Sequence, residues 1–241
     1  MAFLSDTLLA QADSCIGSKS SINCGHAKNI LGTFTPPERV VVDARFLDTL
    51  DERDLRSGVG EMLKAHAIEG PAAFDEIAAA YADLFRNAAT LQHFVRRALE
   101  IKKGYVEEDE FDRGPRNVFN YGHTFGHAIE AATDFAVPHG IAVTLGMDMA
   151  NFIAARLSVG AEEHFARMHP VLARNFRGFE RQPVPLPAFL AAIAKDKKNL
   201  GSGSVTLILP DRAGRIGKST HANDDRFAAL SAEYLEKVRA A

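Results

Sequence analysis

The chain of 241 residues has little cysteine and no long apolar run. Only Cys15 and Cys24 are present, which excludes a disulfide framework and a cysteine-based zinc site and favours the cytoplasm. No apolar stretch reaches the length of a membrane span, so we expect no membrane association. Ala10-Gln11-Ala12 resembles a signal-peptidase site, but no basic region precedes it and Ser5-Asp6-Thr7 interrupts the apolar residues. We therefore expect no signal peptide.

A strong charge of either sign is also missing. The formal net charge is −3, which gives no global case for nucleic-acid binding, although local basic pockets are compatible with it. Hydrophobic residues make up 46% and charged residues 24%, as in an ordinary globular protein. The length allows one large domain or two small ones. Neither a G-x-G-x-x-G motif nor a Gly-Gly-Gly run occurs, so the usual phosphate loop of a dinucleotide site is absent from these residues.

The order of patterns predicts a small α/β beginning followed by a mostly helical body. Residues 1–12 predict a short helix, residues 13–29 a polar loop suited to anions or to solvent, and the β-branched run at 39–43 a buried strand. That run is the clearest strand signal before residue 200. Helices are expected from about residue 51, with Thr49 as a cap, over 60–68 with a stop at Gly70-Pro71, and over 72–85, 89–103, 141–157, 162–175, 186–195 and 225–239. A hairpin is expected near 204–217.

Two histidines stand four residues apart in Gly122-His123-Thr124-Phe125-Gly126-His127. On a helix they would share one face, so they could hold a metal together, or one could bind a metal while the other handles a substrate. A chance pair on a helix is the simpler alternative. Gly122 and Gly126 weaken a helix by about 1 kcal/mol each relative to alanine, which indicates close approach by a backbone or a ligand. Glu61 and Lys64, three residues apart, are expected to form a surface ion pair.

Several motifs together resemble the 3-dehydroquinate synthase family of sugar phosphate cyclases, in the family's order and over nearly the whole chain. The most specific is Asn120-Tyr-Gly-His123-Thr-Phe-Gly-His127-Ala-Ile-Glu130. The others are Asp13-Ser-Cys-Ile-Gly17-Ser-Lys19, Ala27-Lys28-Asn29-Ile-Leu-Gly32, Ser57-Gly-Val-Gly-Glu61-Met-Leu-Lys64, Pro138-His139-Gly140 and Asp196-Lys197-Lys198.

This resemblance implies a metal site on Glu61, His123 and His139, holding Zn²⁺ or Co²⁺. It makes His127 a catalytic histidine on the substrate side instead of a second ligand from the four-residue pair. One carboxylate and two imidazoles leave open positions for substrate oxygens, as a catalytic metal requires. His66 lies five residues from Glu61, matches no family motif and is not expected to be a ligand.

The resemblance also implies a small anionic, phosphorylated substrate and NAD. The groups placed around the substrate are Lys19, Asn29, Lys64, Lys102, Arg116, Asn120 and Lys197; those on the nicotinamide side are Asp13, Lys19 and Lys28. A gathering of lysines and arginine at one metal suits a phosphorylated sugar acid of the DAHP type. The implied protein is a homodimer that binds neither nucleic acid nor membrane.

The implied reaction is that of a carbon–oxygen lyase of the shikimate pathway, which leads to the aromatic amino acids. In the family, NAD takes a hydride from a carbinol, phosphate leaves by β-elimination, the hydride returns, and an intramolecular aldol step closes the carbocycle. The protein contributes mostly orientation and electrostatics.

The implied fold is an α/β start followed by a mostly α-helical metal-binding domain, as in the C-terminal part of dehydroquinate synthase. Residues 1–48 would be the closing part of an α/β dinucleotide-binding domain, and residues 49–241 the helical metal- and substrate-binding domain. Family members begin with a longer α/β domain that carries the glycine-rich loop, so this chain is expected to be a fragment, a mis-called start or a degenerate copy.

Two departures from the family pattern fall in the loop that faces cofactor and substrate. Ser18 stands before Lys19 where the family has glycine, and Cys24-Gly25-His26 replaces a His-Pro-Leu segment. Two other functions stay open: a non-catalytic remnant that serves as a binding or oligomerisation module, and a metal-dependent polyol dehydrogenase. The second has no need for so many phosphate-binding cations.

Overall fold

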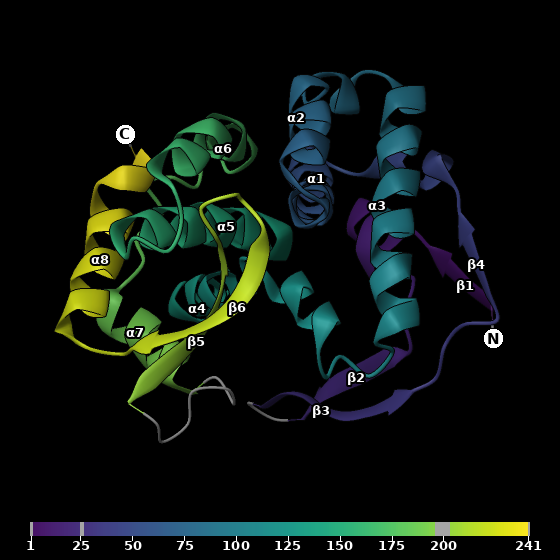
Figure 1. The fold of residues 1–241 in the computed structure, drawn as a ribbon. Helices are drawn as coiled ribbons and strands as arrows, with labels where there is room; N and C mark the ends of the chain where they lie inside the picture. Colours follow the sequence, from purple (N-terminus) through teal and green to yellow (C-terminus); the bar gives the residue numbers. More distant parts are fainter. Residues whose placement is uncertain (1, 25–26, 196–202, 241) are drawn as a thin grey trace.

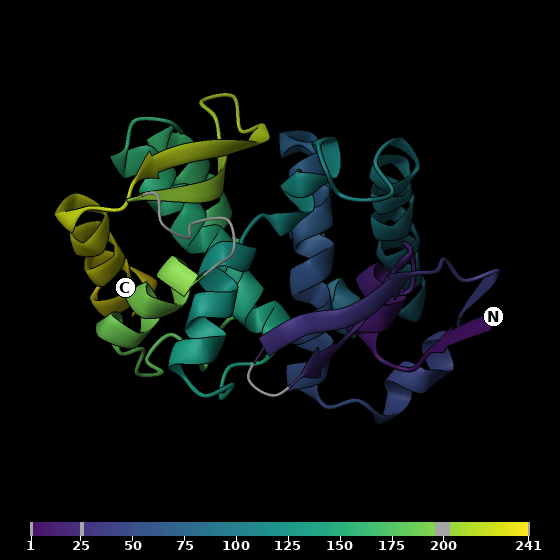
Figure 2. The same ribbon diagram turned by 90° about the horizontal axis from the view of Figure 1, so that it is seen from below.

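The computed structural model describes residues 2–24, 27–195 and 203–240, with the backbone alone for residues 21–24 and 27–31. Lys197 lies outside the described residues, and so do the side chains of Lys28 and Asn29. The described elements form two groups that lie side by side, with the first strands at one end of the molecule and the last helix at the other (Figure 1 and Figure 2).

The first group consists of two small sheets, the α-helices α1 to α3 and several short helical turns. The strands β1 (Ala2–Ser5) and β4 (Arg39–Val42) pair in parallel, and β2 (Lys19–Cys24) pairs with β3 (Ala27–Phe34) as an antiparallel hairpin. Figure 1 shows this hairpin below the lower end of the longest helix of the group, α3. The remaining elements are η1 (Ala10–Ser14), η2 (Ala44–Thr49), α1 (Glu52–Glu69), α2 (Pro71–Ala79), η3 (Asp83–Phe85) and α3 (Ala88–Glu108).

The second group packs its helices around α5, a helix that is buried on nearly all sides from Gly140 to Ala154. A helix that is apolar all round belongs in a core, and α5 supplies the centre of this one. The elements are η4 (Pro115–Asn120), α4 (His123–Ala132), α5 (His139–Arg156), α6 (Glu162–Asn175), α7 (Leu186–Lys195), α8 (Asp225–Glu236), η5 (Val238–Ala240) and the antiparallel strands β5 (Ser204–Pro210) and β6 (Ile216–Ala222).

The helical part of the expected fold is confirmed, whereas the first 34 residues are not as predicted. Residues 1–12 do not form one helix, because residues 2–5 are a strand paired with β4 and the helical turns begin at Leu8. The predicted polar loop at 13–29 contains β2 and the start of β3. The strands β2 and β3 lack a strong alternation of apolar and polar residues. Their conformation therefore depends on the pairing of their backbones and not on local sequence preference.

Helix α1 is one continuous helix where two segments were predicted. It is capped by Asp51, whose side chain accepts a hydrogen bond of 2.8 Å from the Asp54 N–H, and not by Thr49, which ends η2. It stops at Gly70, with φ of 143°, followed by Pro71 at the start of α2. The predicted stop at this glycine and proline is therefore confirmed.

Glycines allow α1 and α5 to approach at backbone distance. A Cβ atom on Gly140 would lie 1.8 Å from the Ser57 carbonyl oxygen, and one on Gly60 would lie 2.2 Å from the Gly140 carbonyl oxygen. Gly122 has φ of 77° and leaves no room for a Cβ beside the Val143 carbonyl oxygen. The close approach expected at Gly122 is confirmed, and it fixes the relative position of the helices that carry the site.

The β1–β4 pair leaves apolar side chains on the surface. Leu4, Val41 and Val42 are 55%, 42% and 40% exposed, as expected for a buried-type strand with few neighbours. A dimer that covers this face remains a prediction. None of the helices in the described parts of the chain combines the length and apolarity that crossing a bilayer requires.

Candidate metal and anion site

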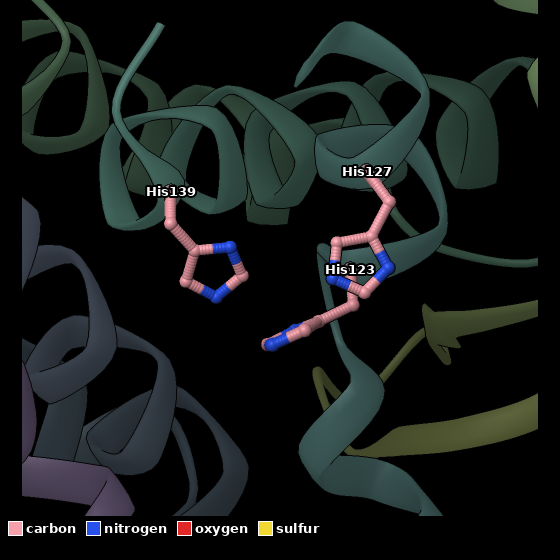
Figure 3. Close-up of side chains that lie close together, drawn as sticks. All are labelled: His123, His127 and His139. Carbon is pink, nitrogen blue, oxygen red and sulfur yellow. The ribbon is translucent and has the colours of Figure 1, made fainter. Parts of the chain in front are cut away.

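Three histidines meet where the start of α4 faces the start of α5. His123 and His127 come from α4 and His139 is the first residue of α5; Figure 3 shows the three rings around one space. One potential ligand atom from each lies within 4.8 Å of the others. The i, i+4 pair therefore does share a face, and a third imidazole joins it from the next helix.

Glu61, on the buried middle of α1, approaches the same space. Its Oε1 atom lies 3.4 Å from His139 Nε2 and 3.8 Å from His123 Nε2. The side chain is 1% exposed, and Oε1 is buried without a hydrogen bond among the described residues. A buried carboxylate oxygen without a donor costs free energy unless a cation or a proton sits beside it.

The two other nitrogens of these histidines are bound to acceptors that orient the rings. His123 Nδ1 lies 3.2 Å from the Tyr121 carbonyl oxygen, so it donates there. His139 Nδ1 lies 3.3 Å from both carboxylate oxygens of Glu130. With Nδ1 as a donor in each ring, both Nε2 atoms point toward Glu61. Nε2 of the neutral His123 is an acceptor, and Nε2 of His139 becomes one when a metal displaces its proton.

The electrostatics of this cluster suit a bound cation. Burial and the nearby Lys64 ammonium hold the pKa of His123 well below its usual value, so this imidazole is neutral. Burial opposes protonation of His139 as well, but Glu130 and Glu61 outweigh it and raise its pKa to about 9. Burial alone would raise the pKa of Glu61; Lys64 and the histidines outweigh it, so the carboxylate is ionised. Protonated His139 and the ammonium of Lys64 together offset the charges of Glu61 and Glu130.

These residues fit a divalent metal. One ionised carboxylate and two imidazole nitrogens, with His139 giving up its proton to the solvent, are a usual donor set for Zn²⁺ or Co²⁺, and the Glu61 oxygen that faces both rings marks the position. His127 is near enough to be an alternative ligand, but its ring is exposed, whereas Glu61 is enclosed. His66 is not part of the cluster: it is buried in the core, where Nδ1 lies 2.7 Å from the Met62 carbonyl oxygen.

An anion pocket of about 380 Å³ adjoins the histidines. It is lined by most of the predicted substrate groups, which come from η1, β2, α1, α3 and η4. They are Asp13, Lys19, Lys64, Lys102, Arg116, Asn120, His123, His127 and His139, together with Asp112 and Phe119. Glu61 is not among the lining residues, but it contacts Lys64, which is. The side chains of the other predicted site residues, Lys28, Asn29 and Lys197, are outside the described part of the chain.

Each lysine of this pocket already has a carboxylate partner. Lys64 contacts Glu61, with both side chains buried, so the pair is not the surface ion pair that the spacing suggested. Asp13 bridges two lysines: its Oδ2 lies 2.7 Å from Lys102 Nζ, and its Oδ1 lies 3.4 Å from Lys64 Nζ. Lys19 Nζ lies 2.5 Å from Asp112 Oδ2. A substrate anion would therefore replace or share these partners.

Arg116 differs from the lysines because it has no ion pair among the described residues. Its side chain is nearly buried, and Nη1 donates 2.7 Å to the Glu110 carbonyl oxygen. The guanidinium is thus positioned by the backbone and retains donors for an oxyanion. Asn120 is held similarly, since its Nδ2 donates 3.0 Å to the Asn117 carbonyl oxygen.

Sequence reasoning missed Glu130, Asp112 and Phe119. Glu130 orients His139, Asp112 pairs with Lys19, and the Phe119 ring lies 5.4 Å from Lys64 Nζ. Glu130 stands in the motif around His123, but nothing in its spacing connects it with His139, because that contact crosses the turn between α4 and α5.

The fold and this site define a class: mostly helical proteins that combine a histidine and glutamate cluster with a pocket lined by lysines and an arginine. Two family models match, 3-dehydroquinate synthase N-terminal over residues 1–57 and 3-dehydroquinate synthase C-terminal over residues 58–199. The chain belongs to the 3-dehydroquinate synthase family.

Curated relatives agree with the family models. The chain is 37% identical over 213 residues to the 3-dehydroquinate synthase of Dictyoglomus thermophilum, covering 87% of this chain and 59% of that protein. It is 36% identical over 229 residues to that of Rhodopseudomonas palustris, covering 90% of this chain and 59% of that protein. The chain thus spans about three fifths of the length of these relatives.

Solved structures share the fold. The 2-epi-5-epi-valiolone synthase of Streptomyces hygroscopicus, with NAD⁺ and Zn²⁺ bound, superposes with a TM-score of 0.83 at 25% identity, over 98% of this chain and 66% of that one. A 2-deoxy-scyllo-inosose synthase with carbaglucose-6-phosphate, NAD⁺ and Co²⁺ superposes with a TM-score of 0.79 at 22% identity, over 96% of this chain and 65% of that one. At 22% identity, the likeness to the inosose synthase concerns the fold alone.

Proposed function

We propose that this chain carries the metal and substrate site of a sugar phosphate cyclase of the 3-dehydroquinate synthase type. The reaction would be elimination of phosphate from a phosphorylated sugar acid, followed by closure of a carbocycle. The carrying observation is that Glu61, His123 and His139 converge beside a pocket that contains Arg116 and three lysines. Membership in the family and the NAD⁺ and metal bound in a structural neighbour support the same function.

The balance of charge supports an anionic substrate. Four cations line the described pocket, Lys19, Lys64, Lys102 and Arg116, against the carboxylates of Asp13 and Asp112; Glu61 and Glu130 beside the histidines bring the carboxylates to four. A divalent ion on Glu61, His123 and His139 would then leave a positive surplus, and a phosphate dianion would offset it. A neutral polyol would leave it uncompensated, which weighs against a polyol dehydrogenase.

The residues of the chain then have distinct tasks. Arg116 and the lysines would bind and orient the phosphate and carboxylate groups. His127, exposed on the pocket wall, would hold or move a proton at an imidazole nitrogen. Glu61, His123 and His139 would hold the metal, with Glu130 fixing the ring of His139. When bound, the metal supplies polarisation of a substrate oxygen and NAD supplies a reversible hydride acceptor.

Calorimetric binding of a DAHP-type substrate in the presence of Zn²⁺ or Co²⁺ tests the substrate site, and phosphate release with millimolar NAD added tests the reaction. Arg116→Ala should lower the affinity, and kcat/KM where phosphate is released, roughly 30- to 900-fold, about 2–4 kcal/mol, because a charged substrate group loses its partner. The neighbouring, exposed Arg113 gives the matched control, and Arg113→Ala should leave the rate within about threefold.

A metal-binding module without catalysis is the second candidate. It is favoured by the lack of a glycine-rich dinucleotide motif within these 241 residues. Such a module would bind Zn²⁺ and the phosphorylated substrate without releasing phosphate. A polyol dehydrogenase would instead reduce NAD with an unphosphorylated polyol, so a parallel assay with such a polyol distinguishes all three functions.

A further inference from the structure

A second charged pocket, of about 520 Å³, lies away from the histidines. It is formed by the first turns of α1, the segment that follows α2, and the end of α6; α1 packs against both α2 and α6, and the three labels stand next to one another in Figure 1. Four arginines line it: Arg56, Arg86, Arg174 and Arg177. None of its lining residues lines the anion pocket of the metal site.

The charge of this arginine pocket is poorly balanced. Glu52 is its one acidic lining residue, and Glu52 Oε1 lies 3.4 Å from Arg56 Nε. Within residues 2–24, 27–195 and 203–240, the side chains of Arg86, Arg174 and Arg177 form no ion pair with a carboxylate. Like charges that share a concave surface repel one another, and an anion between them relieves the repulsion.

Protein contacts hold two of the guanidinium groups in place. The Arg56 side chain is 17% exposed, its Nη1 donates 2.6 Å to the Arg177 carbonyl oxygen, and its Nε is buried without a hydrogen bond among the described residues. The Arg174 guanidinium carbon lies 4.6 Å from the centre of the Tyr81 ring. The Tyr81 hydroxyl in turn donates 3.1 Å to Asn175 Oδ1, so the ring is fixed. Arg56 and Arg174 are therefore positioned by protein contacts, whereas Arg86 and Arg177 are exposed.

The pocket also has an apolar side. Tyr81 and Phe85 stand with ring centres 5.4 Å apart. Small-ligand sites combine such a wall with a few charged groups, and their volumes are on the order of 300–1,000 Å³. Guanidinium groups present paired donors that match the oxygens of a phosphate, so arginine in this number favours phosphate over a single carboxylate.

We propose that the arginine pocket binds a phosphate-bearing anion at a site separate from the metal site. Arg86, Arg174 and Arg177 donate hydrogen bonds to the phosphate oxygens, and the partly buried Arg56 adds positive charge beneath them. The carbon part of the ligand lies against Tyr81 and Phe85. The site does not depend on the proposed cyclase activity, since it shares no lining residue with the anion pocket.

A tryptophan reporter tests this site, because the natural chain contains no tryptophan. Phe85→Trp places one indole on the pocket wall, and inorganic pyrophosphate is titrated at constant ionic strength. A saturable change in fluorescence is expected. Adding Arg174→Gln and Arg177→Gln should weaken binding at least about tenfold, since each removes a charge-assisted contact. Arg116→Gln, in the other pocket, should leave it unchanged.

Two further measurements make the result decisive. Calorimetry on the chain with its natural Phe85 should show a pyrophosphate site that is lost in Arg174→Gln/Arg177→Gln and kept in Arg116→Gln. ADP as a second probe distinguishes the sources: tighter binding than pyrophosphate indicates a nucleotide against the aromatic wall, and equal binding indicates recognition of the phosphate groups alone. The proposal is overturned if neither method detects saturable binding, if sodium chloride reproduces the signal, or if the correctly folded double variant binds as tightly as the natural chain.

Discussion

His139 is held by Glu130 on the side of its ring that faces away from the metal position. Nδ1 of the imidazole lies 3.3 Å from both carboxylate oxygens of Glu130, and the opposite nitrogen lies 3.4 Å from Glu61 Oε1. The two residues come from successive helices, α4 and α5, so the packing of these helices sets the direction of the ligand. Carboxylates that bind a ligating histidine in this way fix its tautomer and raise its basicity.

Glu130→Gln should therefore lower Zn²⁺ affinity about 10- to 100-fold while leaving the three ligands in place. Competition with a chelator of known affinity measures this change. Glu162→Gln, an exposed acid in the first turn of α6, is the matched control and should have no effect. Equal zinc affinity in Glu130→Gln and the natural chain would remove the orienting role of Glu130.

Two glycine-to-alanine substitutions should change stability in opposite directions, one at the contact between α1 and α5 and one on the open face of α3. Gly140→Ala should destabilise the fold by about 2–4 kcal/mol, because its methyl group would meet the Ser57 carbonyl oxygen. Gly104→Ala, on α3 with no atom within 4 Å of the added methyl group, should stabilise it by about 0.5–1 kcal/mol. Urea unfolding of both variants gives the two values. Similar effects of the two substitutions would contradict the packing described here.

A buried histidine outside the site predicts part of the acid sensitivity. Burial, and then Arg167, lower the pKa of His164 to about 4, from 6.5 in the unfolded chain. Arg167 Nη2 lies 3.2 Å from His164 Nδ1, which requires an unprotonated acceptor. The unfolded chain therefore takes up this proton at higher pH than the folded chain. The stability that His164 contributes is present above pH 6.5 and is lost as the pH falls toward 4.

Replacing this histidine should reduce the loss of stability in acid. Between pH 7 and 4, His164→Gln should lose less unfolding free energy than the natural chain, by about 3 kcal/mol. Urea unfolding at several pH values provides the comparison, and the exposed His93, as His93→Gln, is the control. Parallel pH profiles for His164→Gln and the natural chain would show that His164 does not titrate as described.

NAD should bind the 241-residue chain weakly or not at all. Backbone N–H groups of a glycine-rich loop usually hold the pyrophosphate of the dinucleotide, and the sequence contains no such motif. Calorimetric titration of the purified chain with NAD measures this directly. Micromolar affinity would show that the cofactor site is complete without that loop. The titration is read with Arg174→Gln/Arg177→Gln as well, since the arginine pocket could take up a pyrophosphate group.

Sequence patterns predicted the helices better than the strands. Helices such as 162–175 and 186–195 follow directly from apolar periodicity and stop signals, and the structure has these bounds. The strands before residue 35 depend on pairing between segments that are weak alone, so residues 2–5 and 19–24 looked helical or irregular. The exposure of Val41 and Val42 did follow from the sequence. An apolar run needs cover on both faces, and few other strand patterns precede residue 200 to provide it.

At the site, residues within one motif were easier to predict than contacts between motifs. Family resemblance placed Glu61, His123 and His139 together, and the structure brings them within hydrogen-bonding or ion-pair range. It did not indicate that Lys64 would be buried with Glu61, or that Asp13 would bridge Lys64 and Lys102, because these pairings depend on the packing of η1 against α1 and α3. The role of Glu130 required the structure of the α4–α5 turn.

The position of a bound metal tests the central claim most directly. Crystals of the chain grown with Zn²⁺ and measured at the zinc absorption edge would locate the ion by its anomalous signal. We predict one strong peak, about 2.0–2.2 Å from Glu61 Oε1 and from the Nε2 atoms of His123 and His139, with His127 farther away. A peak coordinated by His127 in place of Glu61 or His139, or the absence of zinc from this cluster, would contradict the account.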